Sequence, residues 1–157
     1  MSPELEDLYQ QVLLDHSKRP RNFGEIAEGA VKVHGDNPSC GDEIDLCVRF
    51  GPEREVAEIK FTGQGCAICM ASASMMTTKL KGRSRAEATA LLDSFHTLVT
   101  KGDGAPSPAL GDLQLMEGVR KFPQRVKCAM LAWRAFEQAL AAPGTDGAAE
   151  VSTETRD

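Results

Sequence analysis

Cysteine thiols and one carboxylate are the side chains of this 157-residue chain whose types and spacing suit metal binding. Cys40 lies in the polar loop Asn-Pro-Ser-Cys-Gly-Asp, and Asp42 follows two residues later. A free cysteine usually packs as a small hydrophobic side chain, and a polar loop with a glycine does not favour that role. Zinc accepts sulfur, nitrogen and oxygen ligands in one site. Cys40 and Asp42 are therefore candidate ligands, although Asp42 alone is more typical of a turn.

Two further cysteines lie where a thiolate is favoured. Cys66 ends the run Gly-Gln-Gly-Cys at a predicted strand-to-helix junction, where the glycines allow close backbone approach. The unpaired N–H groups and positive dipole end of the helix lower the pKa of a thiol there. Cys128 falls in the first turns of the last predicted helix, near the cations Arg125 and Lys127. Taken singly, each cysteine is equally consistent with an inert core residue.

The remaining cysteines and the histidines carry weaker signals. Cys69 forms a C-x-x-C pair with Cys66, a spacing found in redox and zinc sites. Such a zinc site normally needs a second pair, and the sequence has none, so we expect Cys69 to pack in the first turn of a helix. Cys47 lies in the middle of a predicted strand and is expected to be structural. The histidines have no ligand-like spacing with the cysteines and are expected to be exposed or hydrogen-bonded: His16, His34 and His96.

Hydrophobic periodicity predicts the elements that position these residues. A helix begins at Pro3 and ends near Ser17, and alternating patterns predict short strands at 31–33, 44–50 and 56–61. Short turns between the strands imply an antiparallel sheet. Helical patterns run from Cys69 to Leu80, from the capping box at Ser84 onward, and from Pro123 to about residue 140. Strands early and helices later predict an α+β domain.

Two segments have compositions that predict little regular structure. Residues 97–115 are rich in Gly, Pro, Asp and Ser, which predicts a loop with one short helical turn. After Ala142 the sequence is rich in Gly, Thr and Glu, which predicts a disordered tail. The predicted organisation is thus one domain over 1–141 and a tail over 142–157.

Composition narrows the classes of function. The chain is 41% hydrophobic and 26% charged, as an ordinary globular protein is. Its net charge of −5 disfavours nucleic acid binding. No segment approaches the roughly 18–20 apolar residues of a membrane span, and the acidic start lacks the pattern of a signal peptide, which predicts a cytoplasmic location. Five cysteines in that reducing compartment favour metal binding or thiol chemistry over disulfides.

Three separated motifs together resemble those of the U-type iron–sulfur cluster assembly proteins. They are Asn-Pro-Ser-Cys-Gly-Asp at 37–42, Gly-Gln-Gly-Cys-Ala-Ile-Cys-Met-Ala-Ser at 63–72, and Lys-Cys at 127–128, and the similarity covers about residues 3–141. The resemblance implies a three-stranded antiparallel sheet packed against four to five helices. It also implies a metal site at one end, with the ligands Cys40, Asp42, Cys66 and Cys128.

Two features distinguish the subfamily. Scaffolds of the IscU type carry histidine before the last cysteine, where this chain has Lys127. An insertion of roughly twenty residues, around Phe95 to Val119, also lengthens a segment predicted as a loop, and such loops are often functional. Both features resemble the SufU type, which binds zinc and accepts persulfide sulfur from a cysteine desulfurase of the SufS type.

The resemblance implies a zinc-dependent sulfur acceptor, at most a sulfurtransferase acting with its desulfurase. Cys40 is the predicted attacking thiolate, because its loop is the most mobile attachment, while Arg125 and Lys127 are candidates for stabilising the anionic site or contacting the partner. A scaffold for a transient [2Fe–2S] cluster on the same ligands remains an alternative. A structural zinc adaptor is a second alternative. A free-standing enzyme is not expected, since no Ser-His-Asp set, phosphate loop or H-E-x-x-H motif is present.

Overall fold

The computed structural model describes residues 3–101, 108–141 and 147–152. In chain order its elements are α1 (Pro3–Lys18), β1 (Val31–Asn37), β2 (Asp42–Phe50), β3 (Val56–Gln64), α2 (Ala67–Leu80), α3 (Arg85–Thr100), the 3-10 segment η1 (Pro108–Lys121), α4 (Pro123–Ala141) and β4 (Gly147–Ser152). Within these ranges no helix has both the length and the apolar character needed to cross a membrane.

The sheet confirms the predicted α+β class and its three antiparallel strands. β2 lies between β1 and β3 and pairs with both in antiparallel register. β1 continues to Asn37, beyond the predicted end at Val33, and Gly35 pairs with Ile44 within this extension. The prediction failed here because ladder pairing with β2 outweighs the weak strand propensity of glycine, aspartate and asparagine. As a result the strand delivers Asn37 directly to the loop that carries Cys40.

The C-terminal segment differs from the predicted disordered tail. Gly147–Ser152 forms β4, which pairs in parallel with β1 and makes the sheet four-stranded, in the order β3-β2-β1-β4. The free edge of β1 offers a row of unpaired backbone N–H and C=O groups. Backbone pairing at such an edge depends little on local composition, so the sequence pattern did not indicate it. The rest of the predicted tail lies outside the described residues.

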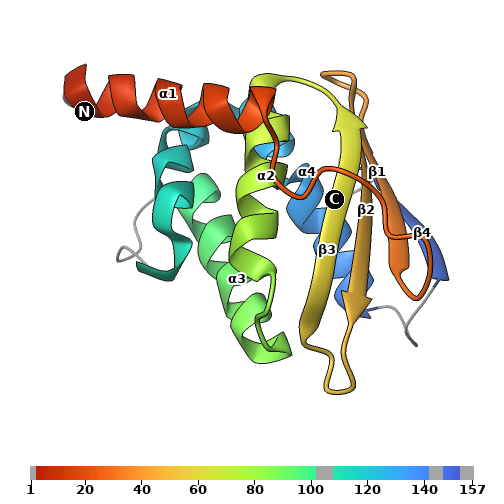
Figure 1. Ribbon diagram of the computed structural model, residues 1–157. Coiled ribbons are helices and arrows are strands. Elements are labelled where there is room, and N and C mark those ends of the chain that lie inside the picture. The colour runs from red at the N-terminus through yellow and green to blue at the C-terminus, as the bar shows by residue number, and fades with distance from the viewer. Residues whose placement is uncertain (1–2, 102–107, 142–146, 153–157) are drawn as a thin grey trace.

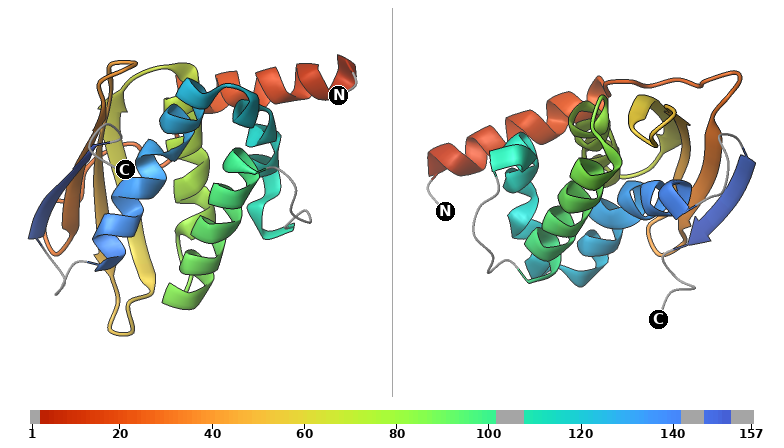
Figure 2. Two further views of the ribbon diagram at one scale, coloured as in Figure 1. Left: turned by 180° about the vertical axis from the view of Figure 1, so that it is seen from behind. Right: turned by 90° about the horizontal axis from the view of Figure 1, so that it is seen from below.

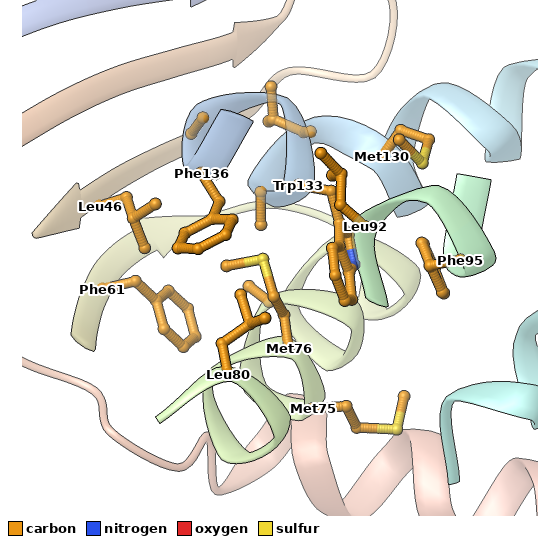
Figure 3. Close-up of a cluster of buried hydrophobic side chains, with 14 of the residues drawn as sticks. Leu46, Phe61, Met75, Met76, Leu80, Leu92, Phe95, Met130, Trp133 and Phe136 are labelled. Carbon is orange, nitrogen blue, oxygen red and sulfur yellow. The ribbon is translucent and has the colours of Figure 1, made fainter. Parts of the chain in front are cut away.

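The helices cover one face of the sheet in successive layers (Figure 1). α2 and α4 lie next to the sheet, α3 and η1 lie beyond them, and α1 crosses one end, as the views from behind and below also show (Figure 2). In the core, Leu46 and Phe61 of the sheet face Phe136 of α4 and Leu80 of α2 (Figure 3). All four side chains are buried. This core holds the ends of β3, α2 and α4 in fixed relation.

The segment predicted as a loop over 97–115 is largely helical. α3 continues to Thr100, and η1 begins at Pro108 and bends at Gly111, where φ is 55°. η1 is held by apolar side chains spaced three residues apart, all buried: Leu110, Leu113, Met116 and Val119. A spacing of three matches the three residues per turn of a 3-10 helix. The pattern was visible in the sequence, but the Gly- and Pro-rich composition dominated the prediction. Residues 102–107 of that loop lie outside the described ranges.

Phe95, at one end of the predicted insertion, belongs to the centre of the core. Its ring stacks on Trp133 of α4, with centroids 4.6 Å apart and planes 15° from parallel. The Trp133 indole N–H donates to Ser72 Oγ of α2 at 3.2 Å. Three helices therefore meet at this aromatic pair, and the predicted capping box of Ser84 and Glu87 fixes the start of the helix that carries Phe95.

A buried histidine fastens the end of α1 to α2. His16 is 8% exposed, and its Nδ1 lies 2.7 Å from Ser74 Oγ, which also accepts the backbone N–H of Arg21 at 2.8 Å. Burial lowers the pKa of His16, and the Arg21 cation acts in the same direction, while Asp15 and Asp112 oppose it. The folded state therefore favours neutral His16.

This pKa shift predicts acid sensitivity of the fold. Since the folded pKa of His16 lies below its unfolded value of about 6.5, its contribution to stability is present above that value and is lost as pH falls through it. We expect the free energy of unfolding of His16→Gln to fall less between pH 7 and pH 5 than that of the wild type, as measured by urea denaturation.

The surface histidine His34 provides a contrast for that experiment. A hydrogen bond with Asp45, at 2.7 Å, raises the pKa of His34. Its stabilising contribution is therefore present below the unfolded pKa and lost as pH rises through the folded pKa. His34→Gln should steepen the loss of stability on acidification, and equal pH profiles for the two variants would contradict both assignments.

Candidate metal centre

The loop between β1 and β2 is a tight turn that presents Cys40. The backbone carbonyl of Asn37 accepts the N–H groups of Cys40 at 3.2 Å and Gly41 at 2.9 Å. Gly41 has φ 74°, a left-handed conformation that glycine adopts without a steric penalty. The turn therefore returns the chain into β2 within four residues and places Asp42 at the first position of that strand.

Three of the four predicted ligands converge at this end of the sheet. One ligand atom each from Cys40, Asp42 and Cys128 lies within 4.8 Å of the others. The sulfur atoms of Cys40 and Cys128 are 3.4 Å apart. A tetrahedral zinc ion with Zn–S bonds of about 2.3 Å holds its sulfur ligands about 3.8 Å apart. The spacing and the chemistry of these donors thus fit zinc.

Cys66, the fourth predicted ligand, flanks this group. It is the N-cap of α2, and its Sγ lies 3.9 Å from Asp42 Oδ2 and accepts the backbone N–H of Cys69 at 3.4 Å. This junction is where β3 ends and α2 begins, at the top of Figure 1. A hydrogen bond from Cys128 lowers the pKa of Cys66 to about 6, although burial opposes the shift. The hydrogen bond from the Cys128 thiol therefore explains why Cys66 favours the thiolate, as the sequence predicted.

Cys128, in contrast, does not favour the thiolate that the sequence predicted. It is fully buried, 0% exposed, at the sixth position of α4. Donation of its hydrogen bond to Cys66 raises the pKa of Cys128, and burial adds to the rise. The expected effect of the helix start and neighbouring cations was outweighed, because Cys128 lies more than a turn inside the helix. The proton is thus favoured on Cys128 and the thiolate on Cys66.

Asp42 is held at both carboxylate oxygens. Its Oδ1 accepts the backbone N–H of Cys66 at 2.9 Å, and the side chain is fully buried. Gly65 makes this approach possible, because a Cβ added there would lie 2.5 Å from Asp42 Oδ1. The sequence predicted that the glycines before Cys66 allow a close backbone approach. At Gly65 the backbone does lie close to the carboxylate of Asp42, the candidate oxygen ligand.

Adding a methyl group at Gly65 is expected to displace the Asp42 carboxylate and weaken zinc binding. We expect Gly65→Ala to lower zinc affinity by about 10–100-fold, the usual effect of disturbing a ligand's support. Competition with a chromophoric chelator measures this. Gly118→Ala is the control, since a Cβ there meets nothing within 4 Å. Unchanged zinc affinity in Gly65→Ala would show that Asp42 is not a ligand.

The predicted cationic neighbours lie at the same end of α4. Arg125 is exposed, and interaction with Cys66 and Cys128 raises the pKa of its guanidinium, so its charge lies close to these sulfur atoms. Lys127 is half-buried next to Cys128. Arg125 therefore lies where it would stabilise an anionic site, and its role remains a prediction.

Other residues lie as follows. Cys69 is buried as predicted, and burial raises the pKa of its thiol. Cys47 is buried with Ile26 and Ala30 in a separate small cluster. Among the described residues, no histidine joins the metal-binding group.

Sequence reasoning missed Asn37, which it treated only as part of a turn. The position of Asn37 before proline in the cysteine loop gave no sign that its side chain would be buried.

The family comparison agrees with this geometry. The model for the NifU-like N-terminal domain matches residues 8–129 of the chain. The chain belongs to this family. The match spans β1 to β3 and the start of α4, and so includes all four predicted ligands.

Relatives of this NifU-like domain carry two kinds of name. An "iron-sulfur cluster assembly scaffold protein IscU" of Streptococcus pyogenes is 44% identical over 87% of this chain and 85% of its own. A "zinc-dependent sulfurtransferase SufU" of Bacillus subtilis is 42% identical over 87% of this chain and 92% of its own. A Fervidobacterium islandicum crystal structure, described as a candidate assembly scaffold for the SUF system, superposes with a TM-score of 0.78 at 31% identity, covering 86% of this chain and 98% of its own.

Proposed function

We propose that this NifU-like domain serves iron–sulfur cluster assembly in the cytoplasm by binding zinc and accepting persulfide sulfur from a cysteine desulfurase. The observation that carries the proposal is the convergence of Cys40, Asp42 and Cys128, with Cys66 beside them, at one end of the sheet. The name of the SufU relative supports the same function. A SufS-type enzyme is the proposed sulfur donor.

The proposed zinc site has three thiolates and one carboxylate and therefore no open position for water. Bound zinc would keep the thiols deprotonated and the site assembled. Neighbouring groups of the protein would hold the ligands in place: the Cys69 N–H donates to the sulfur of Cys66, and Gly65 leaves space for Asp42. Such an arrangement suits controlled release of one thiolate better than hydrolysis.

Cys40 is the proposed sulfur acceptor. The sulfur of Cys66 accepts a backbone N–H, and that of Cys128 accepts the Asn37 amide. The Cys40 sulfur, by contrast, packs against another thiol, with its Sγ 3.4 Å from that of Cys128. Cys40 also lies on a turn and is half-buried rather than fixed in a helix. It is therefore the ligand that leaves most readily.

The proposed transfer is a thiolate exchange without net redox change. The Cys40 thiolate attacks the outer sulfur of the desulfurase persulfide, and a new S–S bond forms on Cys40 as the donor's S–S bond breaks. The desulfurase cysteine leaves as a thiolate, and the proton stays on the transferred sulfur. Arg125, beside the cluster, would stabilise negative charge during the exchange.

A [2Fe–2S] scaffold on the same ligands is the second candidate function. It is favoured by the name of the Streptococcus relative and by the donor set, since three cysteines and a carboxylate are able to ligate a transient cluster. A structural zinc adaptor is the third, and it requires zinc for folding but none of these cysteines for sulfur chemistry.

The deciding experiment measures cysteine desulfurase turnover with increasing amounts of the zinc-loaded chain under reducing conditions. Saturable stimulation, with a persulfide detected on the chain by mass spectrometry, supports sulfur acceptance. No stimulation, combined with a cluster that forms anaerobically and moves to an apo-acceptor, supports the scaffold instead. Tight zinc binding with neither activity supports the adaptor.

A further inference from the structure

The side chain of Asn37 contacts two members of the candidate metal centre, Asp42 and Cys128. It is the last residue of β1 and is fully buried, 0% exposed. Its Nδ2 donates to Asp42 Oδ2 at 3.2 Å and to Cys128 Sγ at 3.5 Å. The Asp42 carboxylate only accepts, so the amide nitrogen rather than the amide oxygen must face it, and the second N–H is then directed to the Cys128 sulfur.

The backbone of Asn37 holds a third member. Its carbonyl accepts the N–H groups that close the turn carrying Cys40. In the β1–β2 ladder Asn37 also pairs directly with Asp42. One residue thus connects Cys40, Asp42 and Cys128, which come from a loop, a strand and a helix 91 positions away in the chain.

The two oxygens of Asp42 have different surroundings. Oδ1 accepts the Cys66 backbone N–H, whereas Oδ2 accepts Asn37 and is the oxygen 3.9 Å from the Cys66 sulfur. With both oxygens held, the carboxylate has one orientation, and Oδ2 faces the Cys66 sulfur. The Asn37 amide also offsets part of the negative charge that Oδ2 and the Cys128 sulfur place close together.

We propose that Asn37 is a positioning residue that sets the affinity and geometry of the metal centre through its hydrogen bonds to Asp42 and Cys128. This inference rests on the proposed metal binding. It adds a residue that does not touch the metal but orders an oxygen ligand and a sulfur ligand at once. Removing such support from ligands typically weakens metal binding by 10–100-fold.

The test compares Asn37→Ala and Asn37→Asp with the full wild-type chain. Zinc affinity is measured by chelator competition, and Co²⁺ is substituted to record its thiolate charge-transfer and ligand-field bands. We expect zinc affinity to fall about 10–100-fold in Asn37→Ala. Asn37→Asp keeps the side-chain volume but replaces a donor with a negative charge, so we expect a larger loss. In both variants the cobalt bands should shift.

Ser74→Ala is the matched control. It removes a buried hydroxyl that bonds His16 and the Arg21 backbone away from the sulfur atoms. We expect it to lower the melting temperature but to leave zinc affinity and the cobalt spectrum unchanged. If Asn37→Ala does not fold, Asn37→Asp and Asn37→Ser, both of similar or smaller size, provide the same readouts.

The outcomes separate the two proposals. If the wild-type chain binds zinc and the Asn37 variants have the same zinc affinity and the same cobalt bands, only the role of Asn37 is overturned. A wild-type chain that binds neither ion would overturn the metal centre itself, and with it this inference. Loss of affinity to the same degree in Ser74→Ala would assign the effect to general destabilisation and would also overturn the positioning role.

Discussion

Replacing Cys40 with alanine is expected to abolish stimulation of a cysteine desulfurase, with a fall of at least about a hundredfold in sulfur transfer to the chain. The reason is that Cys40 supplies the attacking thiolate and no neighbouring sulfur occupies the same loop. Cys66 is the helix cap of α2, and Cys128 is fully buried in α4. Both are attached to helices, whereas Cys40 lies on a turn.

The fold of Cys40→Ala should remain intact, since the side chain is half-buried in a turn and lies at the edge of the core. Transfer is measured with radiolabelled cysteine, and folding by circular dichroism. Cys47→Ala is the control: it removes a thiol that is buried and packed with Ile26 and Ala30 in a separate cluster. It should lose about 1 kcal/mol of stability and no transfer. Near wild-type transfer by Cys40→Ala would refute the assignment.

Replacing Phe95 with alanine is expected to lower the free energy of unfolding by about 3–5 kcal/mol, the range found for buried aromatic residues. The ring is fully buried and stacks on Trp133, so its removal leaves a cavity where α3 meets α4. The variant tests whether the start of the predicted insertion is part of the core rather than an appended loop. Urea denaturation with a constant m-value measures the change.

Phe122→Ala is the matched control for that experiment. Phe122 is 60% exposed, just before α4, and its loss should change stability by less than about 0.5 kcal/mol. An effect of Phe95→Ala as small as that of Phe122→Ala would mean that α3 does not pack on α4 as described.

Several parts of this protein were predictable from local pattern. The alternation in 44–50 and 56–61 predicted β2 and β3, and the pairing of Ser84 with Glu87 predicted the start of α3. These succeeded because each depends on neighbours within a few residues. The regular spacing of Leu110, Leu113 and Met116 was equally local, and it was missed only because composition was given more weight.

The pairing of distant segments was not predictable in the same way. β4 forms on the edge of β1, and Gly35 to Asn37 stay in a strand because β2 lies beside them. In both places hydrogen bonding with another strand provides the stabilisation, and no feature of the segment itself announces that a partner will be present.

The candidate metal centre shows most clearly which properties follow from the sequence and which depend on the tertiary structure. The sequence alone determined which residues are able to bind a metal, because thiols and a carboxylate in glycine-containing loops have few other uses and match a family motif. Only the tertiary structure decided how they act together: Asn37 reaches both Asp42 and Cys128, and Asp42 accepts the backbone N–H of Cys66. The physical reason is that hydrogen bonds and charge interactions depend on distances of a few ångströms, and packing of β1, β2, α2 and α4 sets those distances.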